Sequence, residues 1–153
     1  MKIGVISDTH GLLRPEALQA LAGVDHIVHA GDIGNSDILE ALRQIAPVTA
    51  IRGNVDTHGD CAELPPTDVI ELAGKLFYLV HSEHWLDINP SVAGIAVVVS
   101  GHSHQPGIET RNNVLYLNPG SAGPRRFQLP VTLALVQIVG DTIAARIVEL
   151  IKT

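Results

Sequence analysis

Seven residues of types that bind metal ions each stand just after a short apolar run: Asp8, His10, Asp32, Asn54, His81, His102 and His104. Two carboxylates, one amide and four imidazoles, without a thiolate, suit borderline first-row metals such as Mn, Fe, Ni, Co or Zn. Seven groups exceed what one four-coordinate zinc ion needs. They fit two divalent ions that share one carboxylate, and two ions ~3.5–4 Å apart can clamp a phosphoryl group and activate water.

The apolar runs predict the strands that would position these residues. They lie at 2–6, 26–30, 48–52, 76–80 and 95–99. In open α/β sheets, binding groups gather outside the carboxyl ends of the strands, so the seven side chains should converge. A glycine directly precedes three of them, where it allows a sharp turn and a close backbone approach: Gly31, Gly53 and Gly101.

The order of the predicted elements indicates an α/β fold. Helical spacing at 15–22 and 36–46 between the first three strands is typical of a parallel sheet with right-handed crossovers. One short helix is expected at 84–93. Beyond residue 66, further strands are expected at 68–72, 113–117, 133–139 and 142–151, the last two joined by a Gly140-Asp141 hairpin turn. The later sheet should therefore contain antiparallel strands, and the chain should form a sandwich.

Composition limits the class of protein. The 153 residues fit a single domain, 1–153, and 46% hydrophobic residues with only 3% aromatics indicate an aliphatic core. A net charge of −6 argues against extended nucleic-acid binding, and so against a nuclease. The single Cys61 excludes an internal disulfide and fits a reducing compartment. We expect a cytoplasmic protein without a signal peptide or membrane contact; the sequence gives no indication of its oligomeric state.

The motifs together resemble those of the calcineurin-like metallophosphoesterases. They are DTHG at 8–11, GD at 31–32, GNVD at 53–56, the isolated His81 and GHSH at 101–104. NPGS at 118–121 is similar to the small bacterial and archaeal phosphodiesterases of that superfamily, although we expect it to be a turn that shapes the site wall. The resemblance implies a four-layer αββα sandwich of two mixed sheets flanked by helices. It also implies attack of a metal-bridging hydroxide on the phosphorus of a small phosphate ester.

The resemblance implies an assignment of the ligands. One ion would take Asp8, His10, Asp32 and His104, and the other would take Asp32, Asn54, His81 and His102. Asp32 would bridge the two ions. Asn54 would also lie close to the substrate phosphate.

Two departures from the family pattern leave the proton donor open. Many larger members carry a histidine where this chain has Val55, and that histidine helps to protonate the leaving group. His81 is usually followed by glycine, whereas Ser82, Glu83 and His84 follow here. His84 is a candidate acid.

Other polar residues have a functional and a structural interpretation. Asp56 either orients a ligand histidine or caps a turn. Arg52 and the pair Arg125-Arg126 either bind a phosphate oxygen or carry solvated loop charge. Among the remaining histidines, we expect His26 and His58 to be surface or satisfied buried residues, and His29 to pack behind the ligands.

Two function classes are consistent with the sequence. The first is a phosphodiesterase or phosphatase that acts on a small ester. The second is a protein-interaction scaffold, because the superfamily includes a retromer subunit that keeps this fold as a binding surface. All seven positions retain a metal-competent side chain, which favours the enzyme.

Overall fold

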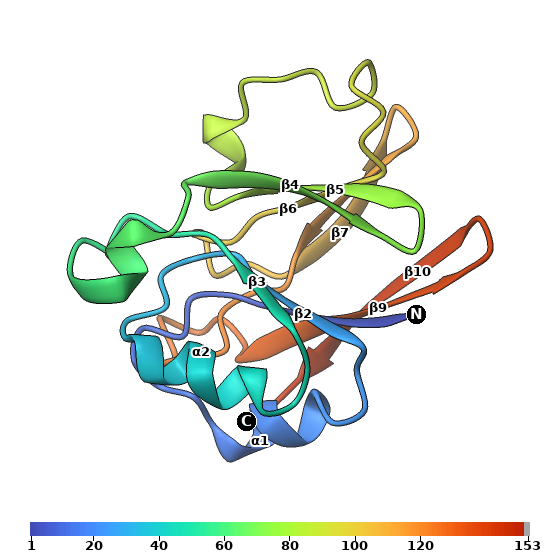
Figure 1. The fold of residues 1–153 in the computed structure, drawn as a ribbon. Coiled ribbons are helices and arrows are strands. Elements are labelled where there is room, and N and C mark those ends of the chain that lie inside the picture. The colour runs from blue at the N-terminus through green and yellow to red at the C-terminus, as the bar shows by residue number, and fades with distance from the viewer. Residues whose placement is uncertain (152–153) are drawn as a thin grey trace.

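The computed structural model describes residues 1–151, and these form two five-stranded sheets packed face to face (Figure 1). The first sheet has the strand order β10-β9-β1-β2-β3, and the second has the order β4-β5-β6-β8-β7. Both sheets are mixed, as predicted. Their strands are β1 (Lys2–Ile6), β2 (His26–His29), β3 (Val48–Ala50), β4 (Thr67–Leu72), β5 (Lys75–Val80), β6 (Val97–Val99), β7 (Gly107–Arg111), β8 (Val114–Asn118), β9 (Thr132–Val139) and β10 (Thr142–Glu149).

The first half of the chain builds the parallel part of the first sheet. Strands β1, β2 and β3 pair in parallel, and the two crossovers contain α1 (Pro15–Ala20) and α2 (Ser36–Arg43). Pro15 opens α1 at a position where its missing N–H costs nothing. Asn35 caps α2, since its side-chain oxygen accepts from the Asp37 N–H at 3.1 Å. Both helices are shorter than predicted, although their places are confirmed.

The later strands confirm the predicted change of pattern. Strands β9 and β10 form an antiparallel hairpin through Gly140-Asp141, and Gly140 has a φ of +57°. In the second sheet, β4 and β7 run antiparallel to their neighbours, while β5, β6 and β8 are parallel. Strand β7 was not predicted, because all five of its residues are exposed and no apolar run marks it.

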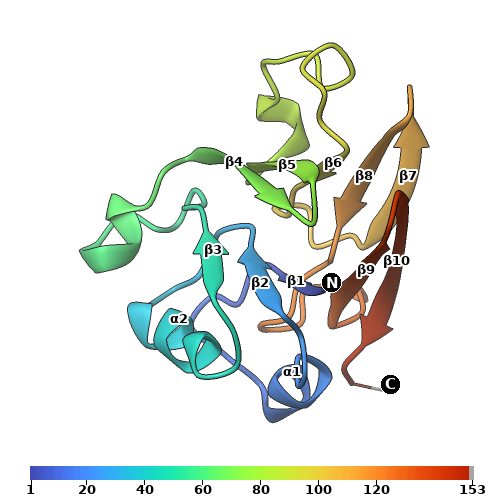
Figure 2. The same cartoon turned by 45° about the vertical axis from the view of Figure 1, so that its right-hand side comes forward.

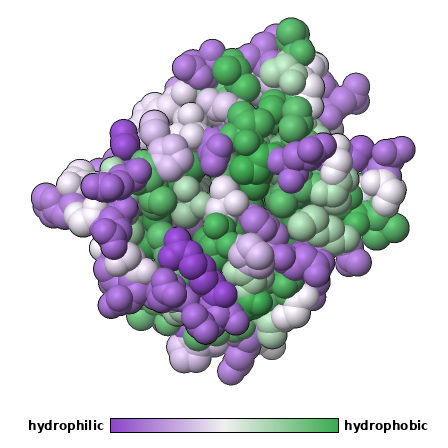
Figure 3. Space-filling view, in the orientation of Figure 1, coloured by the Kyte–Doolittle hydropathy of each residue, from purple (hydrophilic) through white to green (hydrophobic). Residues whose placement is uncertain are grey.

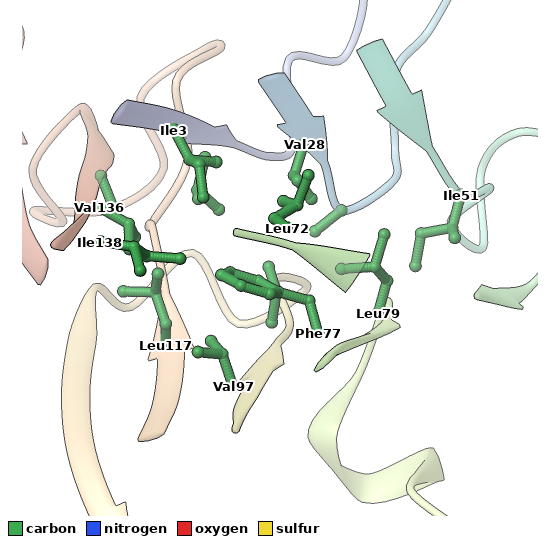
Figure 4. Close-up of a cluster of buried hydrophobic side chains, with 14 residues drawn as sticks. Ile3, Val28, Ile51, Leu72, Phe77, Leu79, Val97, Leu117, Val136 and Ile138 are labelled. Atoms are coloured by element: carbon green, nitrogen blue, oxygen red, sulfur yellow. The ribbon is translucent and has the colours of Figure 1, made fainter. Parts of the chain in front are cut away.

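The main core lies between the two sheets. Aliphatic side chains from both inner faces meet there around Phe77, which is fully buried (Figure 4). A second core lies under α1 and α2, where Ile38, Leu39 and Leu42 of α2 pack on the outer face of the first sheet. These two cores fix the first sheet from both sides, and with it the strand ends at which the predicted ligands stand.

The outer face of the second sheet is covered differently from the prediction. The prediction of a helix at 84–93 is wrong, because only the 3₁₀-helix η2 (Glu83–Trp85) forms and a loop follows it (Figure 2). Pro90 disfavours helical backbone at Asn89, which stops a longer helix. Leu86 and Ile95 of this segment still pack against Tyr78, so the fourth layer exists mainly as a loop. The predicted fold class is otherwise confirmed.

The surface is mostly polar on the face seen in Figure 3. Apolar side chains gather there over β4 and β5, and Val69 of the edge strand β4 is 48% exposed. Among the described residues, no helix is long and apolar enough to cross a membrane.

Candidate metal centre

The ends of five strands bring all seven predicted ligands together. Asp8 and His10 follow β1, Asp32 follows β2, and Asn54 follows β3 a few residues on. His81 follows β5, and the pair His102 and His104 follows β6. The structure thus gathers side chains that are up to 96 positions apart, from Asp8 to His104, at one edge of the sandwich.

The first group consists of Asp8, His10 and His104, whose ligand atoms all lie within 4.8 Å of one another. Asp8 Oδ1 is 3.4 Å from His104 Nε2 and 3.6 Å from His10 Nε2. The Asp8 carboxylate is buried, and within the described part of the chain its Oδ1 has no hydrogen-bond partner. A buried, unpaired carboxylate oxygen is costly unless a cation binds it.

The second group consists of Asp32, His81 and His102, again with ligand atoms within 4.8 Å of one another. Asp32 Oδ2 is 3.2 Å from His81 Nε2 and also 3.7 Å from His10 Nε2 of the first group. Asn54 joins through its Oδ1, which is 3.2 Å from His102 Nδ1. Asp32 therefore stands between the two groups, and a single oxygen, Oδ2, faces both.

Neighbouring groups aim these ligand atoms. The Nδ1–H of His81 donates to the Ala30 carbonyl at 2.7 Å, which leaves Nε2 free to face Asp32. Asp8 Oδ2 accepts from the Ser7 hydroxyl at 2.7 Å and from the His102 N–H at 3.0 Å, which turns Oδ1 toward the histidines. Hydrogen bonds of this kind fix the tautomer and direction of metal ligands in proteins.

The backbone at the centre is strained. Five of the seven candidate ligands have left-handed φ values between +47° and +70°, a conformation uncommon outside glycine: Asp8, His10, Asp32, His102 and His104. Such strain persists only where the surrounding structure enforces it, and it concentrates at functional sites.

Close backbone approach explains two of the glycines. A Cβ added to Gly53 would lie 2.1 Å from Asp32 Oδ1, and one added to Gly101 would lie 2.6 Å from Asp8 Oδ2. Both distances are too short for any side chain. The interpretation of these glycines as positions of close approach is confirmed, because each lets a neighbouring loop pass directly beside a carboxylate.

The electrostatics keep the carboxylates ionised. Burial alone would raise the pKa of Asp8, but the neighbouring imidazoles of His10 and His104 and the hydrogen bond from Ser7 hold it well below its usual range. The pKa of Asp32 is also lowered, since His81 and the Val55 N–H outweigh the effect of burial. Burial alone would lower the pKa of His81, but its contacts with Asp32 and with the Ala30 carbonyl raise it. The two carboxylates are therefore in the deprotonated state that divalent metals require of them.

Several predicted residues lie outside this cluster. Asp56 is buried, but its oxygens accept backbone N–H groups of Ile33, Gly34 and Gly53 rather than a histidine, so the structure favours the turn interpretation. The guanidinium of Arg52 donates to the carbonyls of Ala62 and Leu64 in the adjacent loop. These bonds give Arg52 a structural role.

The remaining predicted polar residues also lie outside the ligand cluster. His29 Nδ1 accepts the Gly31 N–H at 3.1 Å and Nε2 pairs with the Thr9 hydroxyl at 3.1 Å, so His29 packs behind the ligands as predicted. His26 pairs with Thr49 at 2.8 Å. The other predicted polar residues are exposed. His84 lies in η2, and His58 directly precedes the 3₁₀-helix η1 (Gly59–Glu63). Arg125 and Arg126 follow the turn at 118–121.

The segment at 118–121 links two of the loops that carry candidate ligands. Asn118 Nδ2 donates to the Gly101 carbonyl at 3.0 Å and to Ser103 Oγ at 3.1 Å, and the Ser121 hydroxyl donates to the Asp8 carbonyl at 3.0 Å. The turn thereby ties the loop that carries His102 and His104 to the end of β1.

One residue at the centre was missed in the sequence. Trp85 lies over two of the candidate ligands, with its ring centroid 6.0 Å from that of His81 and 5.7 Å from that of His102. The departure from the family pattern after His81 was the only signal, and it drew attention to ionisable residues rather than to an aromatic one.

Comparisons with known proteins agree with this geometry. A family model described as a calcineurin-like phosphoesterase superfamily domain matches residues 1–141. A probable metallophosphoesterase of Methanothermobacter thermautotrophicus is 37% identical, over 97% of this chain and 92% of its own length. Phosphodiesterase YfcE of Escherichia coli is 30% identical over 79% of each chain.

Solved structures show the same fold. A predicted phosphoesterase of Streptococcus pneumoniae has a TM-score of 0.75 at 26% identity, and the match covers 97% of this chain and 88% of the other. Vps29 of Chaetomium thermophilum has a TM-score of 0.77 over 97% of each chain, but its identity is only 18%. The likeness to Vps29 therefore extends to the fold alone.

Proposed function

The chain belongs to the calcineurin-like phosphoesterase superfamily, and we propose that it is a phosphodiesterase that hydrolyses small diesters with two divalent metal ions. One observation carries the proposal. Asp8 Oδ1 and His81 Nε2 are buried without a hydrogen-bond partner within residues 1–151, and they face each other at 3.8 Å across the two ligand groups. We propose Mn²⁺ as the ion, with Fe, Ni, Co or Zn ions as alternatives, because the mixed set of two carboxylates, an amide and four imidazoles is compatible with each of them.

The proposed ligand sets follow the two groups. Asp8, His10, Asp32 and His104 would hold one ion, and Asp32, Asn54, His81 and His102 the other. Asp32 would bridge through Oδ2, because this oxygen faces His10 and His81 at 3.7 and 3.2 Å while Oδ1 accepts the Val55 N–H at 3.0 Å.

The chemistry divides between the ions and the side chains. When bound, two such ions supply an activated water and neutralise negative charge on a phosphoryl group. Asn54 uses its Oδ1 within the ligand group, which leaves its amide N–H groups to donate to a phosphate oxygen. The Val55 side chain has no proton to give, so the leaving oxygen departs with help from solvent, from His84 or from His58. The proposal places the enzyme in the cytoplasm, in keeping with the free, buried Cys61.

The test combines metal content with turnover. The purified protein, loaded with Mn²⁺, should bind two ions per chain and hydrolyse bis(p-nitrophenyl) phosphate. Asp32→Ala should lose or misplace both ions and abolish turnover, whereas Asp60→Ala, at an exposed carboxylate nearby, should change neither. Two retained ions with near-normal turnover in Asp32→Ala would exclude the bridge. Wild-type protein that binds metal and hydrolyses no ester would favour a binding scaffold instead.

A further inference from the structure

Trp85 is the only tryptophan in the chain, and it is 53% exposed beside the proposed second metal group. Its ring is tilted by 46° to His81 and by 40° to His102. Tryptophan usually buries most of its large apolar surface, and a half-exposed indole against polar ligands leaves one apolar side available.

The short segment that carries the indole is held in place from several directions. The backbone N–H of Trp85 donates to the carbonyl of Ser82, the residue before η2, at 2.9 Å. Next to it, Glu83 forms an ion pair with Arg111, whose guanidinium lies 3.8 Å from the centroid of the Tyr116 ring. Leu86 packs into the small core on the outer face of the second sheet. A segment fixed in this way needs little further ordering when a ligand binds beside it.

The groups around Trp85 offer a ligand a polar contact on one side and an apolar contact on the other. His102 and Asn54 are exposed and polar, and in the proposed function they would face the phosphoryl group of a bound ester. Trp85 lies directly beside them, at a centroid distance inside the ~4.5–7 Å over which aromatic rings pack. A planar ring joined to the phosphoryl group through a short link therefore reaches the indole.

From this arrangement, and resting on the function proposed above, we propose that Trp85 is a specificity-determining wall that stacks a planar aromatic ring on one ester group of the substrate. The substrate class is then a phosphodiester that carries an aryl group or a nucleobase. Diesters with only small alkyl groups gain nothing from this wall.

Indole fluorescence tests the stacking directly, because all tryptophan emission comes from position 85. The metal-loaded protein is titrated with phenyl phosphate, adenosine monophosphate, methyl phosphate and inorganic phosphate, with excitation at the red edge of indole absorption. We expect one or both ring-bearing ligands to quench the emission, and which of them does so distinguishes an aryl group from a nucleobase. Equal changes with inorganic phosphate would overturn the proposal, since the indole would then report only anion binding.

Inhibition constants provide the second measurement, with bis(p-nitrophenyl) phosphate as substrate. Trp85→Leu should raise the inhibition constant of the ring-bearing ligand by about tenfold or more, as expected for a lost stacking contact, and leave that of methyl phosphate unchanged. Trp85→Phe should keep most of the affinity, and Phe127→Leu, at a 91% exposed aromatic residue elsewhere, should have no effect.

A structural role for Trp85 gives a different result. If the indole only shields His81 and His102, Trp85→Leu weakens all four ligands equally and lowers the metal content, and the proposal is wrong. Failure of the proposed function is distinguishable, because the metal-loaded wild type would then hydrolyse no bis(p-nitrophenyl) phosphate, whereas failure of the stacking proposal alone leaves wild-type turnover intact.

Discussion

Replacement of Asp56 by alanine tests how the two ligand loops are held. The Asp56 carboxylate accepts the buried Ile33 N–H at 3.0 Å, the Gly34 N–H at 3.2 Å and the Gly53 N–H at 2.8 Å. An unsatisfied buried donor costs ~1–3 kcal/mol. Water can reach the part-buried Gly34 and Gly53, so each of these positions loses only the net ~0.5–1.5 kcal/mol of a hydrogen bond, whereas Ile33 bears the full cost of an unsatisfied donor. The free energy of unfolding should therefore fall by roughly 2–6 kcal/mol. The melting temperature should then fall by about 10 °C for a chain of this size.

The measurement is urea unfolding of the metal-free protein, followed by calorimetric titration with Mn²⁺. The loops that Asp56 joins carry Asp32 and Asn54, so Asp56→Ala should also bind metal more weakly. Asp60→Ala is the matched control, because this carboxylate is exposed in the same region. A stable Asp56→Ala protein that binds metal normally but has lost turnover would refute the reasoning, and Asp56 would then belong to the chemistry.

The other predictions concern charge, proton donation and pH. Asn54→Asp should retain metal but lower turnover by roughly 10²-fold, because it places a negative charge against an anionic substrate; unchanged kinetics would remove Asn54 from the site. With Val55 in place, no side chain at this position protonates the leaving oxygen, so aryl esters should react ~10²–10⁴-fold faster than alkyl esters. Val55→His should reduce this ratio of rates by raising the rate of the alkyl esters. If the wild type instead shows only a small difference between aryl and alkyl esters, and the difference becomes large in His84→Ala or His58→Ala, the replaced histidine is the acid. Burial lowers the pKa of His29 from 6.5 to about 4, so between these values the unfolded chain binds a proton that the folded chain does not. The free energy of unfolding, measured by urea unfolding with chelator, should therefore fall by about 3 kcal/mol as the pH drops from 6.5 to 4. His29→Gln should flatten that fall, and an unchanged slope would contradict the assignment.

The ligand positions were predictable because apolar runs mark the strands in the sequence, and residues that can bind metal stand directly after these runs. Asp8, Asp32 and His81 follow apolar runs that the structure confirms as strands. The grouping of ligands around Asp32 depended on the family resemblance, since spacing alone does not show which histidine faces which carboxylate.

Other features depended on contacts that sequence patterns do not contain. Strand β7 has no buried face, so it lacks the alternation that marks a half-buried strand. The two interpretations of Asp56 could be separated only by seeing that three backbone N–H groups point at it. The segment of Trp85 is held by Leu86, which packs in a cluster that includes Val98 and Val114, and by the ion pair of Glu83 with Arg111, and sequence patterns do not contain these contacts.

The place of β1 in the first sheet has a consequence for biosynthesis. This strand is made before the other nine described strands, yet it lies between β2 and β9, and β9 begins only at Thr132. During translation, one edge of β1 therefore stays open until β9, more than 120 residues later, has left the ribosome. An open edge with buried-type residues such as Ile3 and Val5 is a template for pairing between nascent chains. We expect the nascent protein to depend on chaperones and to fold late, after the β9–β10 hairpin has emerged to close that edge.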